Sequence, residues 1–216
     1  MDMVIPNATS IGVFAAAAML LLLTPGPAVL YVISRSVEQG RMAGLASVFG
    51  ITTGTLVHVL AAAFGLSALL ASSALAFAAV KYAGAAYLIY IGVRRILSRT
   101  DTLAAQRELP GRSLGRLYRD GFVVNLLNPK TALFFLAFLP QFVDPSRGAV
   151  ASQIAFLGLL FTLMGLVSDG LYALVAGTAG RWIKRKGHSF RWERYVTGSV
   201  FIGLGVTAAF AGNGRK

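Results

Sequence analysis

Four side chains that can carry a charge lie inside apolar stretches of the sequence: His58, Lys81, Lys130 and Asp169. A charged group at the centre of a membrane-spanning helix costs roughly 2.5–3.5 kcal/mol on insertion scales. Such residues therefore face a polar interior by default, and they often mark the path of an ion or a substrate. These four positions are the first candidates for chemistry.

Lys130 and Asp169 are predicted to lie at a similar depth. At the helical rise, Lys130 is roughly 13 Å from the Gly121 end of its apolar run, and Asp169 is roughly 16 Å before Arg181. Buried together, the two side chains would form an ion pair, whereas a carboxyl group buried away from any cation would be a proton carrier. The structural alternative is a static pair that only holds two helices together. For the lysine, a further alternative is that it pairs with carbonyl groups freed by Pro129.

His58 and Lys81 also have structural alternatives. His58 is a lone histidine in an apolar helix, so it either relays protons or packs with a hydrogen-bonded ring. Lys81 lies nearer the outer side of its run, seven residues from the start, where it either joins a pathway with Tyr87 or extends its ammonium group to the membrane surface. The sequence thus predicts proton coupling by Asp169 and His58, and a pathway past Lys81 and Tyr87.

Two apolar runs are interrupted by proline, at Thr24–Pro27 and at Asn125–Lys130. Proline removes a backbone donor and clashes with the preceding turn, so each helix must break there. Because unpaired backbone groups are prohibitive in lipid, both segments must line a cavity or be covered by protein. A half-helix that begins near Ala28 would offer free N–H groups and a positive dipole end to a carboxylate.

A zwitterion the size of an amino acid would complement these groups. Its carboxylate would meet the half-helix or Lys130, and its ammonium group would meet Asp169. The predicted substrate contacts are Thr24, Pro25, Gly26, Pro27, Asn125, Asn128, Pro129, Lys130 and Tyr172.

The composition indicates a membrane protein. Of the 216 residues, 56% are hydrophobic and 13% are charged, whereas soluble domains contain about 25% charged residues. Since a bilayer core needs about 20 apolar residues per helix, the chain is long enough for six spans. The predicted spans are Ser10–Ile33, Ala43–Leu70, Ala74–Leu97, Gly121–Val143, Ile154–Thr178 and Tyr195–Ala211.

The net charge of +12 follows the spans rather than a nucleic-acid-binding face. Most of the 20 lysines and arginines fall in the gaps after the first, third and fifth spans. The gaps after the second and fourth spans contribute only Arg147. The positive-inside rule then predicts that both termini lie outside, in the periplasm. No nucleic-acid partner is expected.

A long polar segment divides the chain into two halves of three spans each. We predict one transmembrane domain over residues 1–216, with a first repeat at 1–97, a cytoplasmic loop at 98–118 and a second repeat at 119–216. An odd number of spans in each half gives the halves opposite orientations, and matching interruptions in such halves indicate a transporter site at the midplane. The predicted fold is an all-α integral membrane protein of two inverted three-helix repeats, with proline-broken first and fourth helices.

Several short motifs occur in the order found in a known family. They are Thr24-Pro25-Gly26-Pro27, Gly50-x-x-x-Gly54-x-x-x-His58, Lys81-x-x-Gly84-x-x-Tyr87, Asn125-x-x-Asn128-Pro129-Lys130, Asp169-x-x-Tyr172 and a glycine-rich last span. Together they resemble the LysE/RhtB amino-acid exporters over nearly the whole chain. The resemblance implies a six-helix exporter of the bacterial inner membrane that exchanges protons for an amino acid or a related metabolite. Two lysines and one aspartate in the spans favour a neutral amino acid.

Other functions fit the same residues less well. An intramembrane enzyme would use Asp169, His58 and Lys81, but the sequence has no nucleophile elbow, metal-ligand cluster or paired catalytic carboxylates. A passive small-solute channel is a further alternative. With no cysteine and two histidines, neither a metal nor a cofactor is predicted. The expected partners are an amino acid, protons and the lipid bilayer, and self-association into a homo-oligomer is left open.

Overall fold

The computed structural model describes residues 6–72 and 112–185, together with isolated positions between 79 and 97 and between 199 and 206. All regular structure in this part of the chain is helical, and it contains no strand. The predicted third and sixth spans lie almost wholly outside the described residues.

Among the described residues, two helices are long and apolar enough to cross a membrane, Arg41–Leu66 and Val150–Thr178. Two bent helix pairs also qualify if each pair is counted as one span, which raises the number to four. The described part of the chain is therefore that of an all-helical membrane protein.

The first span is broken where its prolines predict. Helix α1 (Ala8–Leu23) ends just before this segment, and α2 (Pro27–Gln39) leaves it at a bend of 50°. The chain then turns at Gly40, whose φ of 87° lies in the left-handed region that favours glycine. Helix α3 (Arg41–Ser72) begins immediately after this turn.

The fourth span is broken in a similar way. Helix α5 (Leu114–Leu126) is followed by α6 (Pro129–Leu133), and the bend across the break is 45°. The chain then continues as a π-helix, η1 (Phe134–Phe138), and a 3₁₀ turn, η2 (Leu139–Phe142). A proline at the first turn of α6 explains the break, because proline is tolerated there but not in a helix interior.

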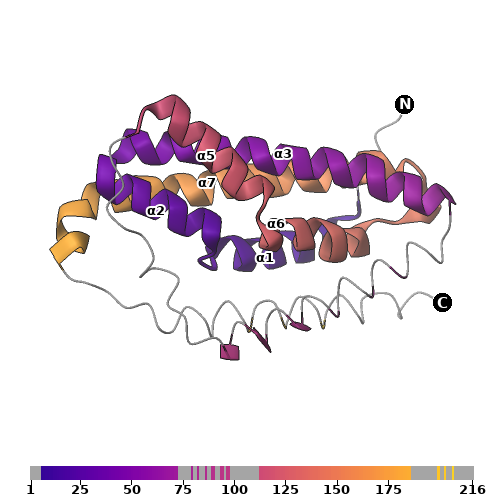
Figure 1. Ribbon diagram of the computed structural model, residues 1–216. Coiled ribbons are helices and arrows are strands. Elements are labelled where there is room, and N and C mark those ends of the chain that lie inside the picture. Colours follow the sequence, from indigo (N-terminus) through magenta and orange to yellow (C-terminus); the bar gives the residue numbers. More distant parts are fainter. Residues whose placement is uncertain are drawn as a thin grey trace.

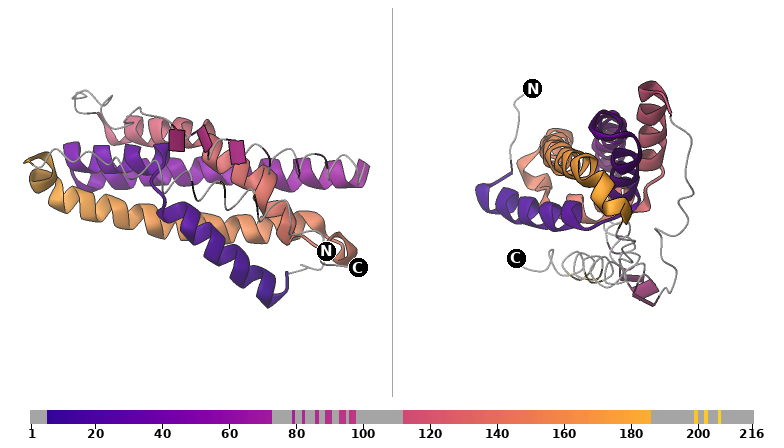
Figure 2. Two further views of the ribbon diagram at one scale, coloured as in Figure 1. Left: turned by 90° about the horizontal axis from the view of Figure 1, so that it is seen from below. Right: turned by 90° about the vertical axis from the view of Figure 1, so that its left-hand side faces the viewer.

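A second 3₁₀ turn, η3 (Pro145–Arg147), leads to the long helix α7 (Val150–Arg185). Helices α3 and α7 pack lengthwise against each other and form the long axis of the described fold (Figure 1). Helix α5 packs along α3, and α2 contacts both α3 and α7 (Figure 2). Helix α1 ends and α6 begins beside this pair, and the two breaks contact each other there (Figure 1).

Helices α3 and α5 approach each other closely because glycine lies at their contact. The Gly50-x-x-x-Gly54 spacing predicts such packing. A Cβ atom at Gly50 would lie 2.0 Å from the carbonyl oxygen of Tyr118. A Cβ atom at Gly121 would lie 2.5 Å from the carbonyl oxygen of Ser47. Neither position has room for a side chain, so the two backbones are in direct contact.

Two apolar clusters pack on either side of the breaks. The larger one joins α1, α3, the segment from α6 to η2 and the first half of α7. Phenylalanines and leucines are its main large side chains, and the rings of Phe134 and Phe161 stack with their centroids 4.5 Å apart. The smaller cluster joins α2, α3 and α7 around Val32, Val48 and Ala173. The polar residues of the breaks lie between these two clusters.

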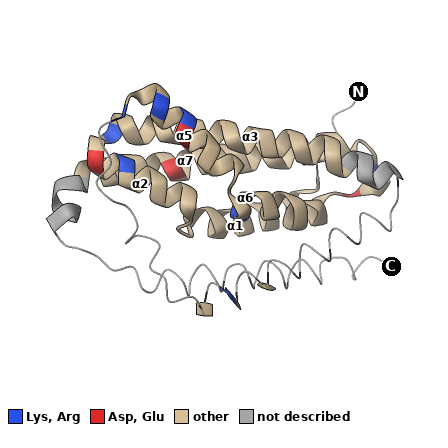
Figure 3. Cartoon of the chain, viewed as in Figure 1, with Lys and Arg blue, Asp and Glu red and all other residues tan. Residues whose placement is uncertain are grey.

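Charged residues gather at one end of the described fold, where α2 ends and α3 and α5 begin (Figure 3). We call this the arginine-rich end; it contains Arg35, Arg41, Arg112, Arg116 and Arg119. By the positive-inside rule it is the end predicted to face the cytoplasm.

Candidate functional site

A cavity of about 40 Å³ lies between the two helix breaks and the long helices α3 and α7. Since one water molecule needs about 10–15 Å³, this cavity admits on the order of three waters. Its polar lining consists of one lysine, one carboxylate, two amides and four hydroxyl groups, from Lys130, Asp169, Asn125, Asn128, Thr52, Thr55, Thr131 and Thr162. Residues from both halves of the chain therefore meet at one place.

Lys130 lies at the start of α6 and is only 9% exposed. Its Nζ atom donates a hydrogen bond of 2.6 Å to the carbonyl oxygen of Thr24, in the other break. Its alkyl chain packs over Gly26, where a Cβ atom would lie 3.1 Å from Cδ of the lysine. A side chain at position 26 would therefore require the lysine to shift by a few tenths of an ångström where it crosses from one break to the other.

Asp169 lies in the middle of α7 and is 6% exposed. Its Oδ1 atom accepts no hydrogen bond from the described residues. Lys130 is the charged group with which this carboxyl group interacts electrostatically. The two residues that were predicted to share a depth therefore line one cavity, and the carboxyl group retains an oxygen that is free to bind a donor.

The first turn of α2 adds a second positive feature. Gly26 is the N-cap residue, and no side chain caps the helix there. The first N–H groups of a helix have no partner within the helix, and they attract anions. Ala28 and Val29, in this first turn, line the cavity. The α6 helix differs, because the side chain of Asn128 accepts a hydrogen bond of 3.1 Å from the N–H of Lys130.

Asn125 connects the second break to α3. Its Nδ2 atom donates to the carbonyl oxygen of Ile51 and to Oγ1 of Thr55, both at 2.8 Å. Its Oδ1 atom accepts from Oγ1 of Thr131 at 3.0 Å and from Nδ2 of Asn128 at 3.4 Å. Both donors of this amide are in use, so Asn125 fixes the geometry of the cavity wall.

Comparison with known proteins agrees with this transporter-like architecture. The LysE type translocator family matches residues 19–212, which covers most of the chain and both helix breaks. The protein is a LysE-type translocator. As a member of this family it is a membrane transporter and not an enzyme, which confirms the predicted resemblance. No solved structure matches the chain.

Several curated relatives of this LysE-type translocator match along nearly their full length. A homoserine/homoserine lactone efflux protein from Salmonella typhimurium is 34% identical over 196 residues, which cover 89% of this chain and 92% of the relative. An uncharacterized membrane protein from Vibrio cholerae is 34% identical over 197 residues, covering 90% of this chain and 93% of the relative. One from Bacillus subtilis is 28% identical over 197 residues, with coverages of 88% and 93%.

Two predicted site residues of this LysE-type translocator contact the breaks rather than the cavity. The hydroxyl group of Tyr172 donates a hydrogen bond of 2.9 Å to the carbonyl oxygen of Leu23. The Nε2 atom of His58 lies 3.1 Å from the carbonyl oxygen of Asn125, so Nε2 carries the proton. Neither residue belongs to the cavity lining. Their predicted roles in substrate binding and proton coupling stay predictions.

The other predicted site residues lie in the two breaks or outside the described part of the chain. Thr24, Pro25, Gly26 and Pro27 form the first break, and Gly26 also lines the cavity of the translocator. Pro129 is the first residue of α6. Lys81 and Tyr87, predicted to lie on a pathway, are outside the described residues.

Four threonines of the cavity wall are missed by sequence reasoning: Thr52, Thr55, Thr131 and Thr162. Three of them donate to the carbonyl four residues earlier in their own helix, to Val48, Ile51 and Gly158. A threonine whose hydroxyl group bonds a carbonyl of its own helix is tolerated in an apolar helix. The presence of these threonines in an apolar run therefore does not indicate a binding site. The hydroxyl oxygens keep lone pairs and can accept hydrogen bonds from a solute.

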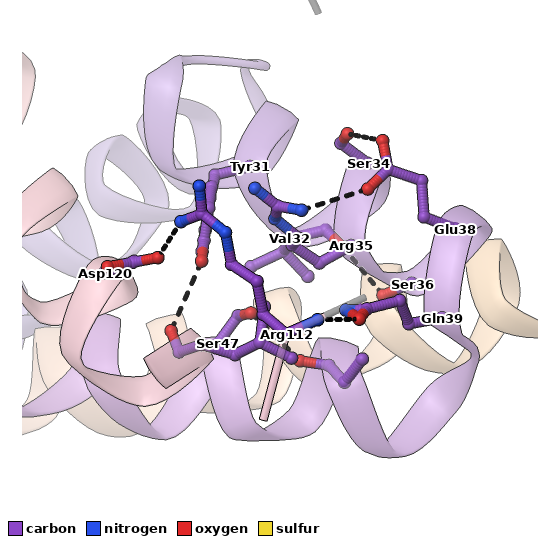
Figure 4. Close-up of polar contacts among 12 residues, drawn as sticks. Tyr31, Val32, Ser34, Arg35, Ser36, Glu38, Gln39, Ser47, Arg112 and Asp120 are labelled. Atoms are coloured by element: carbon purple, nitrogen blue, oxygen red, sulfur yellow. Dashed lines mark hydrogen bonds and ion pairs between the residues drawn. The ribbon is translucent and has the colours of Figure 1, made fainter. Parts of the chain in front are cut away.

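A separate polar network lies at the arginine-rich end of the translocator (Figure 4). Arg112 and Asp120 form an ion pair. The Oε1 atom of Gln39 accepts a hydrogen bond of 2.5 Å from the backbone N–H of Arg112. Arg35 is 2% exposed and pairs with Glu38 at 3.1 Å. This network connects α2 to the start of α5.

Proposed function

We propose that the protein exports small neutral amino acids, or close derivatives of them, across the bacterial inner membrane in exchange for protons. The observation that carries this proposal is the cavity between the two helix breaks. It combines a positive region, formed by Lys130 and the uncapped start of α2, with the carboxyl group of Asp169. A zwitterion has this same combination of charges at a short separation.

The two ends of the solute would bind to opposite sides of the cavity. The carboxylate is attracted to the N–H groups of Ala28 and Val29 and to the nearby ammonium group of Lys130. The α-ammonium group donates to the free Oδ1 atom of Asp169. A solute with an additional positive or negative side-chain charge would leave that charge without a partner in the cavity, which is strongly unfavourable. Neutral amino acids are therefore preferred.

The side chain of the solute would face the threonines. Their hydroxyl groups already donate within the protein, so they are available as acceptors for a hydroxyl group on the solute. Two curated relatives, from Salmonella typhimurium and Salmonella typhi, are homoserine/homoserine lactone efflux proteins. Homoserine combines a zwitterionic backbone with a side-chain hydroxyl group, and it is our leading candidate. Threonine is the next.

The cavity of about 40 Å³ is too small for an amino acid, so the solute must bind when the breaks move apart. We propose that two inverted three-helix halves move relative to each other around the breaks and open the cavity to one side at a time. Asp169 takes up a proton from the outside and releases it inside, and each transfer changes its affinity for the solute ammonium group. We propose that both termini lie in the periplasm, because the arginine-rich end then faces the cytoplasm, as the positive-inside rule favours.

The proposal is tested with the purified full-length protein in inside-out oriented liposomes across a pH gradient. Radiolabelled homoserine, threonine, leucine, lysine and glutamate are offered one at a time. We expect saturable, gradient-driven accumulation of homoserine and threonine, weaker accumulation of leucine, and none of lysine or glutamate. The recovered solute should be chemically unchanged.

Other outcomes would contradict the proposal in different ways. Flux that rises linearly with solute concentration would indicate a channel. Preferential transport of lysine would contradict the charge argument. Accumulation that ignores the pH gradient would separate the transport function from proton coupling.

A further inference from the structure

Two prolines free one backbone carbonyl each. Within a helix, the N–H group of a residue bonds to the carbonyl four residues earlier, and proline has no N–H group. Pro27 therefore cannot satisfy the carbonyl of Leu23, and Pro129 cannot satisfy the carbonyl of Asn125. In a membrane interior such carbonyls must be satisfied by other protein groups or by water.

Each freed carbonyl is met by a side chain from the opposite half of the chain. The carbonyl of Leu23, in the first half, accepts a hydrogen bond of 2.9 Å from the hydroxyl group of Tyr172 in α7. The carbonyl of Asn125, in the second half, is 3.1 Å from Nε2 of His58 in α3. Lys130 adds a third contact of this kind, since its Nζ atom donates to the carbonyl of Thr24.

The donors themselves are held in place. The imidazole ring of His58 stacks on Phe135, with the ring centroids 6.1 Å apart and an angle of 18° between the planes. Tyr172 packs against the apolar cluster of α2, α3 and α7. The carbonyl of Asn125 also accepts the backbone N–H of Asn128 at 3.0 Å and that of Leu127, so the imidazole joins two local bonds and ties them to α3.

We propose that His58 and Tyr172 are positioning residues that cap the helix breaks reciprocally, each from the other half of the protein. Through them, α3 holds the end of α5, and α7 holds the end of α1. The wall of the cavity is thus fixed by contacts that cross between the halves, and these contacts must be exchanged when the halves move. This role does not depend on which solute is transported.

Hydrogen exchange in the purified protein tests the caps without any transport assay. In Tyr172→Phe we expect the backbone amides of residues 24–30 to exchange about tenfold faster, because the lost cap lets that break open. In His58→Ala we expect the same acceleration in residues 125–132 instead. Tyr118→Phe is the matched control, since its hydroxyl group donates a hydrogen bond of 2.9 Å to Oγ1 of Thr53 and touches neither break. It should leave both segments unchanged.

Transport measurements then separate positioning from proton transfer for His58. Glutamine can donate from a similar position but cannot carry a proton at these pH values. We expect His58→Gln to keep transport and its pH profile, whereas His58→Ala loses about tenfold or more in rate because the cavity wall is displaced.

Three results would overturn the proposal. The first is a His58→Gln variant as inactive as His58→Ala with an altered pH profile, which would make the histidine a proton carrier. The second is wild-type exchange at both breaks in Tyr172→Phe and His58→Ala. The third is exchange that accelerates around the mutated residue alone, which would show that the caps do not act across the halves.

Discussion

The ammonium group of Lys130 donates a hydrogen bond of 2.6 Å to the carbonyl oxygen of Thr24, so a residue of one helix break satisfies the backbone of the other. The same side chain lines the cavity and interacts electrostatically with Asp169. Holding the break and supplying positive charge to the cavity are therefore two effects of one geometry. A solute carboxylate would bind beside a lysine that the protein has already positioned.

Replacing this lysine should weaken solute binding. In Lys130→Ala we expect the apparent affinity to fall at least about tenfold, equivalent to about 1.4 kcal/mol, because the positive charge in the cavity is lost. The measurement is the KM for solute exchange in liposomes. Lys130→Met is the matched control, since it keeps the alkyl packing over Gly26 and should show a similar loss. Unchanged affinity in both variants would make Lys130 a purely structural residue.

Asp169→Asn should uncouple transport from protons. The amide keeps the shape of the carboxyl group but cannot take up and release a proton in this pH range. We expect accumulation driven by a pH gradient to disappear, whereas exchange of labelled for unlabelled solute at equal pH persists at a reduced rate. Both quantities are measured in the same liposome preparation. Full gradient-driven accumulation by this variant would exclude the proposed role of Asp169.

The contact between α3 and α5 predicts an unusual response to alanine. In Gly50→Ala the new Cβ atom would lie 2.0 Å from the carbonyl oxygen of Tyr118, so the helices must separate. We expect a loss of about 1–3 kcal/mol, which is typical of overpacking, seen as a lower melting temperature in detergent. Gly65→Ala in the same helix is the control, because no atom lies within 4 Å of a Cβ there. Alanine should be neutral or stabilising at that position, since it favours helices more than glycine by about 1 kcal/mol.

The threonines should determine the preference for hydroxylated solutes. Thr162→Val keeps the shape of the side chain and removes an oxygen that lines the cavity. We expect transport of homoserine to fall by about fivefold relative to that of leucine, which corresponds to about 1 kcal/mol for one hydrogen bond. Competition between the two solutes measures this ratio directly. An equal loss for both solutes would place Thr162 in packing rather than in selectivity.

Much of the fold follows from the sequence because its causes are local. Pro27 and Pro129 break their helices wherever they occur in an apolar run, since the missing N–H group does not depend on the surroundings. The similar depth of Lys130 and Asp169 follows from the rise of a helix and the position of the basic segments. The arginine-rich end is likewise visible in the spacing of its residues.

The details of the site depend on the rotation of each helix about its own axis. This rotation is set by contacts between helices, which the residue pattern of one helix does not show. Nothing around Asn125 indicates that its amide would bond Ile51 and Thr55 on another helix. Tyr172 and His58 are recognisable as polar residues, but the carbonyls that they meet follow from tertiary packing alone.

The two breaks carry similar prolines, yet their helix starts are occupied differently. Asn128 fills the start of α6 with its own side chain, whereas the start of α2 has no such occupant. An assembly of two identical inverted halves would present equivalent sites to the two sides of the membrane. In the transport cycle that we propose, this inequivalence would make the two half-cycles kinetically distinct. The protein would then act as a rectifier of flux, while the ion and solute gradients still set the final equilibrium.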